Sequence, residues 1–326
     1  MKTARHEITS NLYGELVVYG GTANQPLTES VCHWLGICQA ESTVTTFPNS
    51  NTFVQLAHSA RSKDVFLIQP TSAPANDNLM ELLIFIETLR RDSAGRITAV
   101  IPYYGYGRSD KKDVPRSPIT ARLVADLIVT AGADRALVVD CHAGQIQGFF
   151  NIPVDEVSAI DIIADHFRSL DLDLNQTTVV SPDVGSVKRA RNLAEKLHVP
   201  MAIIEKRRSH QTGLAMFSII GEVKNRDLIL FDDEIDTGST ICKAAEYLKE
   251  HGGRRLFAAA THPVLSGGAV ELLVNSEFAE VIVTDSIPVP QGHRTDSFHI
   301  LPMGRTLAGV IDRIHRGESV GEYLNY

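Results

Sequence analysis

The residues best suited to chemistry lie in one short stretch, residues 228–241, with the sequence LILFDDEIDTGSTI. Four apolar residues lead directly to two adjacent carboxylates, Asp232 and Asp233. An apolar run without alternation is typical of a strand buried on both faces of a parallel sheet. Open α/β sheets bind their ligands at the carboxyl ends of such strands. The stretch therefore predicts a binding loop between a strand at 228–231 and a helix at 238–251.

The turn that follows, residues 236–240, is suited to a phosphate. Its backbone N–H groups and the hydroxyls of Ser239 and Thr240 can point at one spot, in front of the positive end of the next helix dipole. The two carboxylates before it would repel phosphate, so we expect them to accept hydrogen bonds from sugar hydroxyls or to help hold a divalent cation. The combination favours a sugar 5-phosphate site over the alternative, a solvated and well-capped helix start.

Two other predicted strand ends carry polar groups. His142 follows an apolar run, and Asp183 follows another in the second half of the chain. Magnesium prefers oxygen ligands and keeps several waters, so we expect His142 to contact a nucleotide phosphate or a metal-bound water. Asp183 is a candidate cation ligand, although an Asp before Gly is also a common turn residue. A structural role for either residue remains open.

Two basic clusters could neutralise phosphates. The first lies within residues 101–118, where tyrosines could also pack on a base, and the second is the run Lys206-Arg207-Arg208. The run could close over transferring phosphates and stabilise developing charge. A solvated charged loop is the alternative for each. The cations of the first cluster are Arg108, Lys111, Lys112 and Arg116.

The elements that must position these groups follow a repeated strand–helix order, which predicts parallel sheets flanked by helices. The chain of 326 residues fits two domains of about 150 residues each, and we place them at 1–155 and 156–326. We expect strands at 16–19, 65–69, 97–102, 136–140, 177–181, 202–205, 228–231, 256–261 and 281–284, and helices at 26–37, 76–91, 118–131, 186–197, 238–251, 267–275 and 307–316.

Bulk properties exclude several classes of protein. The net charge of −8 argues against a general nucleic-acid binder, which needs a basic face. The four cysteines are scattered without a C-x-x-C pair, as in reduced cytosolic proteins. No signal peptide is visible, and no apolar run approaches the roughly 20 residues of a membrane span. We expect a soluble, cytoplasmic protein with no nucleic-acid or membrane partner.

The order "apolar strand, D-D-x-x-D-T-G-x-T, helix" resembles the ribose-phosphate loop of phosphoribosyltransferases and of ribose-phosphate pyrophosphokinase (PRPP synthetase). Further matches extend over about residues 14 to 324 and are similar to the second family alone, so a phosphoribosyltransferase is disfavoured. These matches are DVFLIQPTSAPANDNLMELLI (64–84), PRSPITARLVADL (115–127), HAGQIQGFFNIPVD (142–155), SPDVGSVKRA (181–190), the run 206–208 and GESV (317–320).

The resemblance implies an α/β fold of two phosphoribosyltransferase-like, Rossmann-like domains, the first with ATP-site and oligomer contacts and the second with the ribose 5-phosphate loop. It implies a diphosphotransferase of nucleotide biosynthesis that moves the β,γ-diphosphoryl group of MgATP to the C1 hydroxyl of ribose 5-phosphate, giving PRPP and AMP. It also implies Mg²⁺ as cofactor and a homo-oligomer, hexamer or dimer, with ATP bound partly across a subunit boundary.

Residue roles carried over from the resemblance fall into four groups. The catalytic residues are Lys206 and Arg208. Ribose 5-phosphate is held by Arg208, Asp232, Asp233, Asp236, Thr237, Gly238, Ser239 and Thr240. The nucleotide is held by Phe47, Asn49, Ser50, Asn51, Arg108, Ser109, Asp110, Lys111 and His142. The metal residues are His142 and Asp183.

Departures from the family pattern cluster at the nucleotide end. Asn51 replaces a glutamate that helps to recognise the base, and Ser109 replaces a glutamine. An amide can donate or accept, whereas a carboxylate only accepts, so we expect altered or relaxed nucleotide choice. The departures also keep open a different class of function, a catalytically silent regulatory subunit that binds an active paralogue. The intact positions 206, 208 and 232–238 favour activity.

Overall fold

The computed structural model describes residues 13–208, 215–293 and 297–323, and for positions 206–208, 215–217, 293 and 322 it describes the backbone alone. The chain divides into two compact units, each of which is described by itself. Unit 1 comprises Met1–Val157 with Gly304–Tyr326, and unit 2 comprises Ser158–Met303. The closing segment therefore groups with the first half of the chain, whereas the sequence analysis placed it in the second domain.

Unit 1 is built on a parallel sheet with the strand order β1-β4-β5-β6-β7. Its central strands are buried along their whole length, which explains their continuous apolar runs. The described strands are β1 (Leu16–Gly20), β4 (Asp64–Ile68), β5 (Arg96–Ile101), β6 (Arg135–Val139) and β7 (Val154–Val157).

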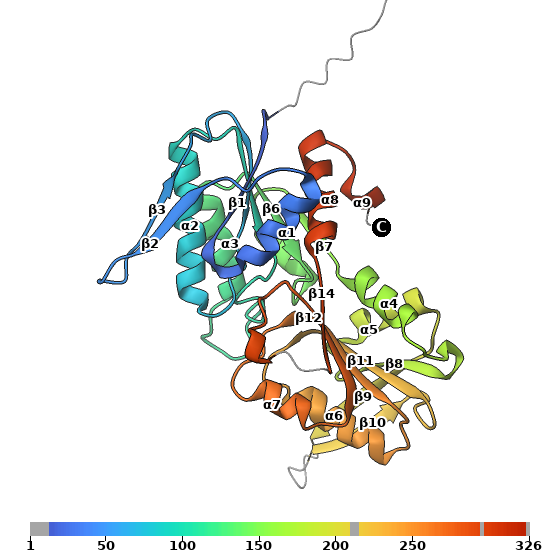
Figure 1. Ribbon diagram of the computed structural model, residues 1–326. Coiled ribbons are helices and arrows are strands. Elements are labelled where there is room, and N and C mark those ends of the chain that lie inside the picture. Colours follow the sequence, from blue (N-terminus) through green and yellow to red (C-terminus); the bar gives the residue numbers. More distant parts are fainter. Residues whose placement is uncertain (1–12, 209–214, 294–296, 324–326) are drawn as a thin grey trace, which may run out of the picture. The chain divides into compact units, whose positions relative to one another are not determined.

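Helices cover both faces of the unit 1 sheet (Figure 1). Helices α2 (Ala75–Arg91) and α3 (Thr120–Ala131) share one hydrophobic core with alternate residues of the strands. Helix α8 (Gly304–Arg316) packs beside α1 (Gln25–Leu35), and the backbone of Gly304 lies so close to Ser30 that a side chain at 304 would collide with it. This packing accounts for the place of the closing segment, which ends in the short helix α9 (Val320–Tyr323).

A hairpin that the sequence analysis did not predict interrupts the strand–helix order of unit 1. Strands β2 (Ser42–Thr46) and β3 (Thr52–Leu56) pair antiparallel and extend outward at the left of Figure 1, with β3 beside α2. The two strands are polar on most positions, so they lack the apolar runs that revealed the buried strands.

Unit 2 contains a larger sheet with the order β10-β9-β8-β11-β12-β13-β14. All of its described pairs are parallel except β9 with β10, so the predicted fold class, mostly parallel sheets flanked by helices, is confirmed. The strands are β8 (Thr177–Ser181), β9 (Met201–Arg208), β10 (Ala215–Ile220), β11 (Asp227–Ile235), β12 (Leu256–Pro263), β13 (Phe278–Thr284) and β14 (Phe298–Leu301).

Helices also lie on both faces of the unit 2 sheet, with α4 and α5 above it and α6 and α7 below it in Figure 1. The strands at 177–181 and 256–261 and the helices over 186–197 and 238–251 agree with the sequence analysis to within a few residues. Helix α4 and strands β10 and β14 were not predicted. The helices are α4 (Ile160–Ser169), α5 (Val187–Leu197), α6 (Ser239–Glu250) and α7 (Ala269–Val274).

Two strands of unit 2 that carry predicted site residues, β11 and β9, run further than the sequence indicated. Strand β11 continues beyond Phe231 to Ile235 because it keeps its parallel pairing with β12, so Asp232 and Asp233 belong to the strand and not to the loop after it. Strand β9 continues through Arg208 because β10 pairs with it antiparallel. The backbone of the basic run is therefore extended strand. No helix among the described residues has the length and apolar character needed to cross a membrane.

Candidate active site

Three acidic positions of unit 2 meet at the carboxyl ends of two neighbouring parallel strands, β8 and β11. Asp183 follows β8, and its Oδ1 accepts hydrogen bonds from the backbone N–H and the hydroxyl of Ser186, at 2.9 and 3.1 Å. The Ser186 hydroxyl lies 2.5 Å from Oδ1 of Asp232 on β11. Ser186 thus links the predicted metal residue Asp183 to the predicted ribose residue Asp232.

The Asp232 and Asp233 carboxylates are neighbours, and each contacts the start of α5, Asp232 through Ser186 and Asp233 through Arg189. The Asp233 carboxylate is 2% exposed, and one of its oxygens lies 3.4 Å from a guanidinium nitrogen of Arg189 on α5. The backbone N–H of Asp233 also donates to Asp232 Oδ1 at 2.8 Å. Burial, together with the neighbouring Asp233 carboxylate, raises the pKa of Asp232 well above its ordinary value. Sugar hydroxyls or a cation at this spot would stabilise its ionised form.

The turn between β11 and α6 has the geometry expected of a phosphate site. Gly238 adopts a left-handed backbone with φ of 74°, which residues with a side chain adopt only with strain, and Ser239 begins α6 directly after it. The first turn of α6 carries no acidic residue, so the positive end of the helix is left to an anion. The Thr237 and Ser239 hydroxyls lie 3.2 Å apart at this end.

A second loop of unit 2 holds Asp236 in place. The Asp236 carboxylate accepts a hydrogen bond from the Ser266 hydroxyl, and its backbone carbonyl accepts one from the Ser266 N–H at 3.1 Å. Thr237 and Thr240 are exposed beside it. The structure therefore brings the predicted ribose 5-phosphate residues Asp232, Asp233, Asp236, Thr237, Gly238, Ser239 and Thr240 into one continuous strand end and helix start.

The predicted catalytic cations lie on β9, next to β8 in the same sheet. The backbones of Lys206 and Arg208 pair with Phe217 and Ala215 of β10. Their side chains lie outside the described part of the structure, so their roles stay predictions.

In unit 1, predicted nucleotide residues gather after the neighbouring strands β5 and β6. A Cβ atom at Gly107 would lie 3.4 Å from Cβ of His142, so the turn before Arg108 passes against His142. Gln145 donates a hydrogen bond to the buried Asp110 carboxylate, which ties the two loops together.

Two of the predicted nucleotide residues, Ser109 and Asp110, stabilise the loop itself. The Ser109 hydroxyl accepts from the N–H of Thr120 at 3.2 Å and so helps to start α3, while its carbonyl accepts from Ala121. Lys111 is exposed, 3.8 Å from Asp113. Arg108 is exposed at the same edge. Ser109 and Asp110 thus hold the loop together, and Arg108 and His142 are better placed to meet a nucleotide.

The remaining nucleotide residues lie at the tip of the β2–β3 hairpin. Ser50 has a left-handed backbone with φ of 66°, and the N–H of Phe47 donates to the carbonyl of Asn51 at 2.9 Å. Asn49 accepts from the N–H of Asn51, and the rings of Phe47 and Phe53 lie 6.0 Å apart. For the described chain, all these contacts are internal to the hairpin. The structure does not bring Phe47, Asn49, Ser50 and Asn51 to Arg108 and His142.

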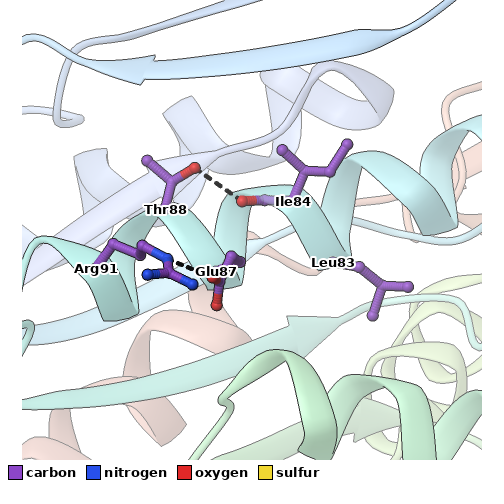
Figure 2. A pocket seen from close by; sticks show the side chains of 5 residues that line it. All are labelled: Leu83, Ile84, Glu87, Thr88 and Arg91. Carbon is purple, nitrogen blue, oxygen red and sulfur yellow. Dashed lines mark hydrogen bonds and ion pairs between the residues drawn. The ribbon is translucent and has the colours of Figure 1, made fainter.

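The pocket of about 380 Å³ in Figure 2 is not the active site. It lies on α2 of unit 1 and is lined by Leu83, Ile84, Glu87, Thr88 and Arg91. Its polar side chains are engaged on the helix itself, with Arg91 2.6 Å from Glu87 and the Thr88 hydroxyl bonded to the carbonyl of Ile84. None of these residues belongs to the predicted site.

The donor atoms at the unit 2 strand ends fit a magnesium ion. Asp183, Asp232 and Asp233 supply carboxylate oxygens, the ligand type that Mg²⁺ prefers. A cation beside them would offset the burial and the Asp233 charge that raise the pKa of Asp232. Of the predicted metal residues, Asp183 lies in unit 2 and His142 in unit 1. Their roles at a metal site stay predictions.

Two residues of the network were missed by the sequence analysis. Ser186 and Arg189 contact the carboxylates of Asp232 and Asp233. Ser186 stands inside the SPDVGS motif, and Arg189 follows it by three residues, so both were visible as polar residues near a strand end. Their contacts depend on the pairing of β8 with β11, which the sequence alone did not give.

Comparisons with known proteins identify the class of this fold and site. A model of the N-terminal domain of ribose phosphate pyrophosphokinase matches residues 16–132, and a model of the phosphoribosyl synthetase-associated domain matches residues 208–325. The chain belongs to the ribose-phosphate pyrophosphokinase family, which confirms the predicted resemblance.

Full-length relatives agree. The chain is 48% identical over 307 residues to a ribose-phosphate pyrophosphokinase of Caldanaerobacter subterraneus, covering 94% of this chain and 97% of the relative. It is 45% identical over 309 residues to that of Rhizobium meliloti, covering 94% and 99%. The crystal structure of phosphoribosylpyrophosphate synthetase from Mycobacterium smegmatis has a TM-score of 0.88 and 41% identity, covering 93% and 99%. These findings confirm the predicted enzyme class and give no support to the regulatory-subunit alternative.

Proposed function

We propose that this chain forms PRPP and AMP from MgATP and ribose 5-phosphate, with the two substrates held by different strand ends. One observation carries the proposal. The carboxylates of Asp183 and Asp232, joined by Ser186, stand directly before a helix start at Gly238 that is open to an anion. An acidic group beside an anion site is what a phosphorylated sugar requires.

Ribose 5-phosphate occupies unit 2 in this proposal. Its phosphate lies at the start of α6, where the hydroxyls of Thr237 and Ser239 and the backbone N–H groups donate to it. Its ring hydroxyls donate to the carboxylates of Asp232 and Asp236. This arrangement separates the negative phosphate from the negative side chains, since the helix end lies after the turn and the carboxylates before it.

The nucleotide occupies the strand ends of unit 1. Arg108 binds its phosphates, and His142 hydrogen-bonds a phosphate or a water beside it. The exposed hairpin tip with Asn51 reads the base. Because the tip has only internal contacts, we propose that it serves the nucleotide site of a neighbouring subunit in a homo-oligomer, a hexamer or a dimer. We also propose a cytoplasmic enzyme, consistent with its free cysteines.

The chemistry is an in-line displacement on phosphorus. The C1 oxygen of ribose 5-phosphate bonds to the β-phosphorus of ATP, the bond from that phosphorus to the bridging oxygen of AMP breaks, and the C1 hydroxyl loses its proton. Mg²⁺, with Asp183 as a protein ligand, would neutralise phosphate charge when bound. Lys206 and Arg208 stabilise the charge that develops on the transferring group, and the strand-end residues of each unit orient the substrate bound there.

The proposal is tested by following AMP and PRPP with the purified chain, Mg²⁺ and ribose 5-phosphate, in separate reactions with ATP, GTP and CTP. Product with ATP alone would establish ordinary nucleotide choice. Product with several nucleotides would support a remodelled base site at Asn51. A folded protein that forms no product with any of them would overturn the proposed activity.

A further inference from the structure

A cluster of two histidines and one glutamate lies in unit 2, apart from the proposed substrate site. Glu280 stands on β13, His299 on the adjacent strand β14, and His166 in the last turn of α4. Each offers one ligand atom, and the three atoms lie within 4.8 Å of one another. The proposed activity gives these residues no role.

The sheet places two of the three side chains on the same face. Glu280 and Ile282 point the same way because they are two residues apart on one strand, and Ile282 pairs with His299. Helix α4 covers this face. Its Phe167 lies edge-on to Phe257, with ring centroids 5.9 Å apart, and Phe257 is the register partner of Glu280 on β12. The third member, His166, is therefore held over the strands by the packing of its neighbour.

The distances fit a tetrahedral metal ion. Glu280 Oε2 lies 3.4 Å from Nε2 of His166 and 3.3 Å from Nε2 of His299. A zinc ion with bonds of about 2.0–2.1 Å to each ligand would separate neighbouring ligand atoms by roughly 3.3 Å, the edge of its tetrahedron. Two of the three edges are already of that length, and the two imidazole rings, 5.2 Å apart, lie within reach of one ion.

The three side chains are partly shielded from solvent, which suits an ion held by the protein. The side chains of His166 and Glu280 are only 14% and 24% exposed, and that of His299 is 39% exposed. The nearby cation Arg255, 5.9 Å from the Phe257 ring, is already engaged by Asp227 at 2.6 Å. The ion pairs described for Glu280 are those to the two imidazoles.

We propose that His166, Glu280 and His299 form a binding site for a divalent transition metal of the zinc type, with water as the fourth ligand. Two imidazoles and one carboxylate suit zinc, whereas magnesium and calcium prefer all-oxygen ligands. The ion would join α4, β13 and β14. Strand β14 is the last in the described strand order, next to β13. The ion would therefore give this edge strand a second attachment, to α4.

The site is tested in the full-length protein with Co²⁺, a spectroscopic substitute for Zn²⁺, in the absence of nucleotide. Tetrahedral Co²⁺ has strong visible absorption, whereas octahedral Co²⁺ at an all-oxygen magnesium site absorbs weakly, so the two kinds of site are distinguished. We expect one equivalent of tetrahedral Co²⁺, displaced by one equivalent of Zn²⁺. Bound Zn²⁺ should raise Tm by about 2–4 °C.

Three variants assign the signal. His299→Ala and His166→Ala should each lower Zn²⁺ affinity by more than about 100-fold, and Glu280→Gln, which keeps the side-chain shape, should do so as well. His251→Ala removes an exposed histidine of the same unit and should leave the affinity unchanged. Far-UV circular dichroism checks that each variant is folded.

PRPP formation with Mg²⁺ should persist in His299→Ala, which separates this site from the catalytic one. Absence of tetrahedral absorption in the wild-type protein would overturn the proposal. So would an affinity that His299→Ala and Glu280→Gln leave unchanged, because the ion would then be held elsewhere.

Discussion

The two units are alike at one edge of their sheets and different at the other. At the amino edge, each has a fully buried aspartate that opens a central strand, Asp64 on β4 and Asp227 on β11. Arg96 donates two hydrogen bonds to the Asp64 carboxylate, at 2.7 and 2.6 Å. Arg254 donates two hydrogen bonds to the Asp227 carboxylate, at 2.8 and 2.6 Å. The same clamp joins neighbouring strands in both units.

At the carboxyl edge the units diverge. Unit 2 presents linked carboxylates and an open helix start, whereas unit 1 presents Arg108 and His142 on loops that Asp110 and Gln145 hold together. Similar sheets thus offer opposite chemistry at the edge where α/β folds bind ligands. We therefore propose that the amino edge serves stability and the carboxyl edge serves substrate binding. Substitutions at the two edges should therefore have separable effects.

The largest effect is expected from Asp64→Asn at the amino edge of unit 1. The substitution leaves the guanidinium of Arg96, only 9% exposed, without its counter-charge, and His315 also loses its partner at 2.8 Å. We expect a loss of about 3–5 kcal/mol in the free energy of unfolding. Urea unfolding followed by the fluorescence of Trp34, the single tryptophan and a residue of unit 1, measures it. A loss below about 1 kcal/mol would contradict the clamp.

Asp227→Asn provides the matched change in unit 2 and should cost less, about 1–2 kcal/mol, because Arg254 and Arg255 are about half exposed and stay hydrated. The cost should also depend on pH. Burial alone would raise the pKa of Asp227, but the two arginines outweigh it and lower the pKa to about 2. A lowered pKa stabilises the folded protein above the unfolded value, near 3.8, and this contribution fades as pH falls toward 2.

Hydrogen exchange of β11 and β12 at pH 7 and pH 3 follows this contribution. The difference between wild-type protein and Asp227→Asn should shrink at the lower pH. An unchanged difference would show that the charge of Asp227 is not what stabilises the edge.

Lys206→Ala should have the largest effect on catalysis. If Lys206 stabilises charge only on the transferring group, kcat should fall by about 10²–10³-fold while the Kd for ribose 5-phosphate stays within about twofold. Rapid-quench measurement of AMP and calorimetric titration of ribose 5-phosphate give the two quantities. Equal losses in both would assign Lys206 to substrate binding and place binding and chemistry on the same residues of unit 2.

Asp232→Asn tests the carboxyl edge of unit 2. The amide keeps the size of the side chain but weakens the hydrogen bonds to ribose hydroxyls and to Ser186. We expect the KM for ribose 5-phosphate to rise by about 10–100-fold, with the KM for ATP changed much less. Ser266→Ala, which removes the hydroxyl partner of Asp236, should produce a smaller change in the same direction. A rise confined to the KM for ATP would reverse the assignment of the two edges.

Arg108→Ala makes the corresponding change in unit 1. Loss of one cation at an exposed phosphate contact should raise the KM for ATP by about tenfold and leave the KM for ribose 5-phosphate nearly unchanged. Arg116→Ala, at another exposed position of the same basic cluster, is the control for the loss of one positive charge. Steady-state kinetics with each substrate varied in turn measures both constants. An equal effect of the two substitutions would show that only the charge of the loop matters.

The sequence predicted the carboxyl edge of unit 2 better than that of unit 1, for a physical reason. The predicted ribose 5-phosphate residues 236–240 are consecutive in the chain, so their proximity follows from chain connectivity. Gly238 has the backbone of a turn, and its helix begins at Ser239, close to the predicted 238. Buried strands such as β4 and β5 were equally clear, because apolar runs of this kind require burial on both faces.

What the sequence missed depends on pairing between distant segments. Strand β11 was predicted to end before Asp232 because the apolar run ends at Phe231, yet pairing with β12 extends it to Ile235. The polar hairpin β2–β3 has no apolar alternation to reveal it. The bond from Ser186 to Asp232 joins residues 46 positions apart. Such contacts follow from tertiary structure and could not be read from local pattern.

The smallest effect is expected from Asn51→Glu at the hairpin tip. This change tests the predicted nucleotide residues of unit 1. Asn51 is exposed, and its N–H already bonds to Asn49, so its side chain can be exchanged without disturbing a core. A carboxylate accepts a hydrogen bond from the exocyclic amine of adenine but repels the carbonyl at the same position of guanine. We expect the ratio of kcat/KM for ATP over GTP to rise by about 2–10-fold.

Asn49→Glu moves the same charge two residues along the tip and is the matched control. If it changes the ATP over GTP ratio as much as Asn51→Glu does, the added charge acts at a distance and the tip does not read the base. If only Asn51→Glu changes the ratio, base choice lies on a hairpin tip whose described contacts are all within the hairpin. Mixing inactive Lys206→Ala subunits with Asn51→Glu subunits would then show which chain supplies the tip. Because only the Asn51→Glu subunits are active in this mixture, a return of their ratio toward the wild-type value would place the tip in the neighbouring subunit, and an unchanged ratio would place it in the same chain.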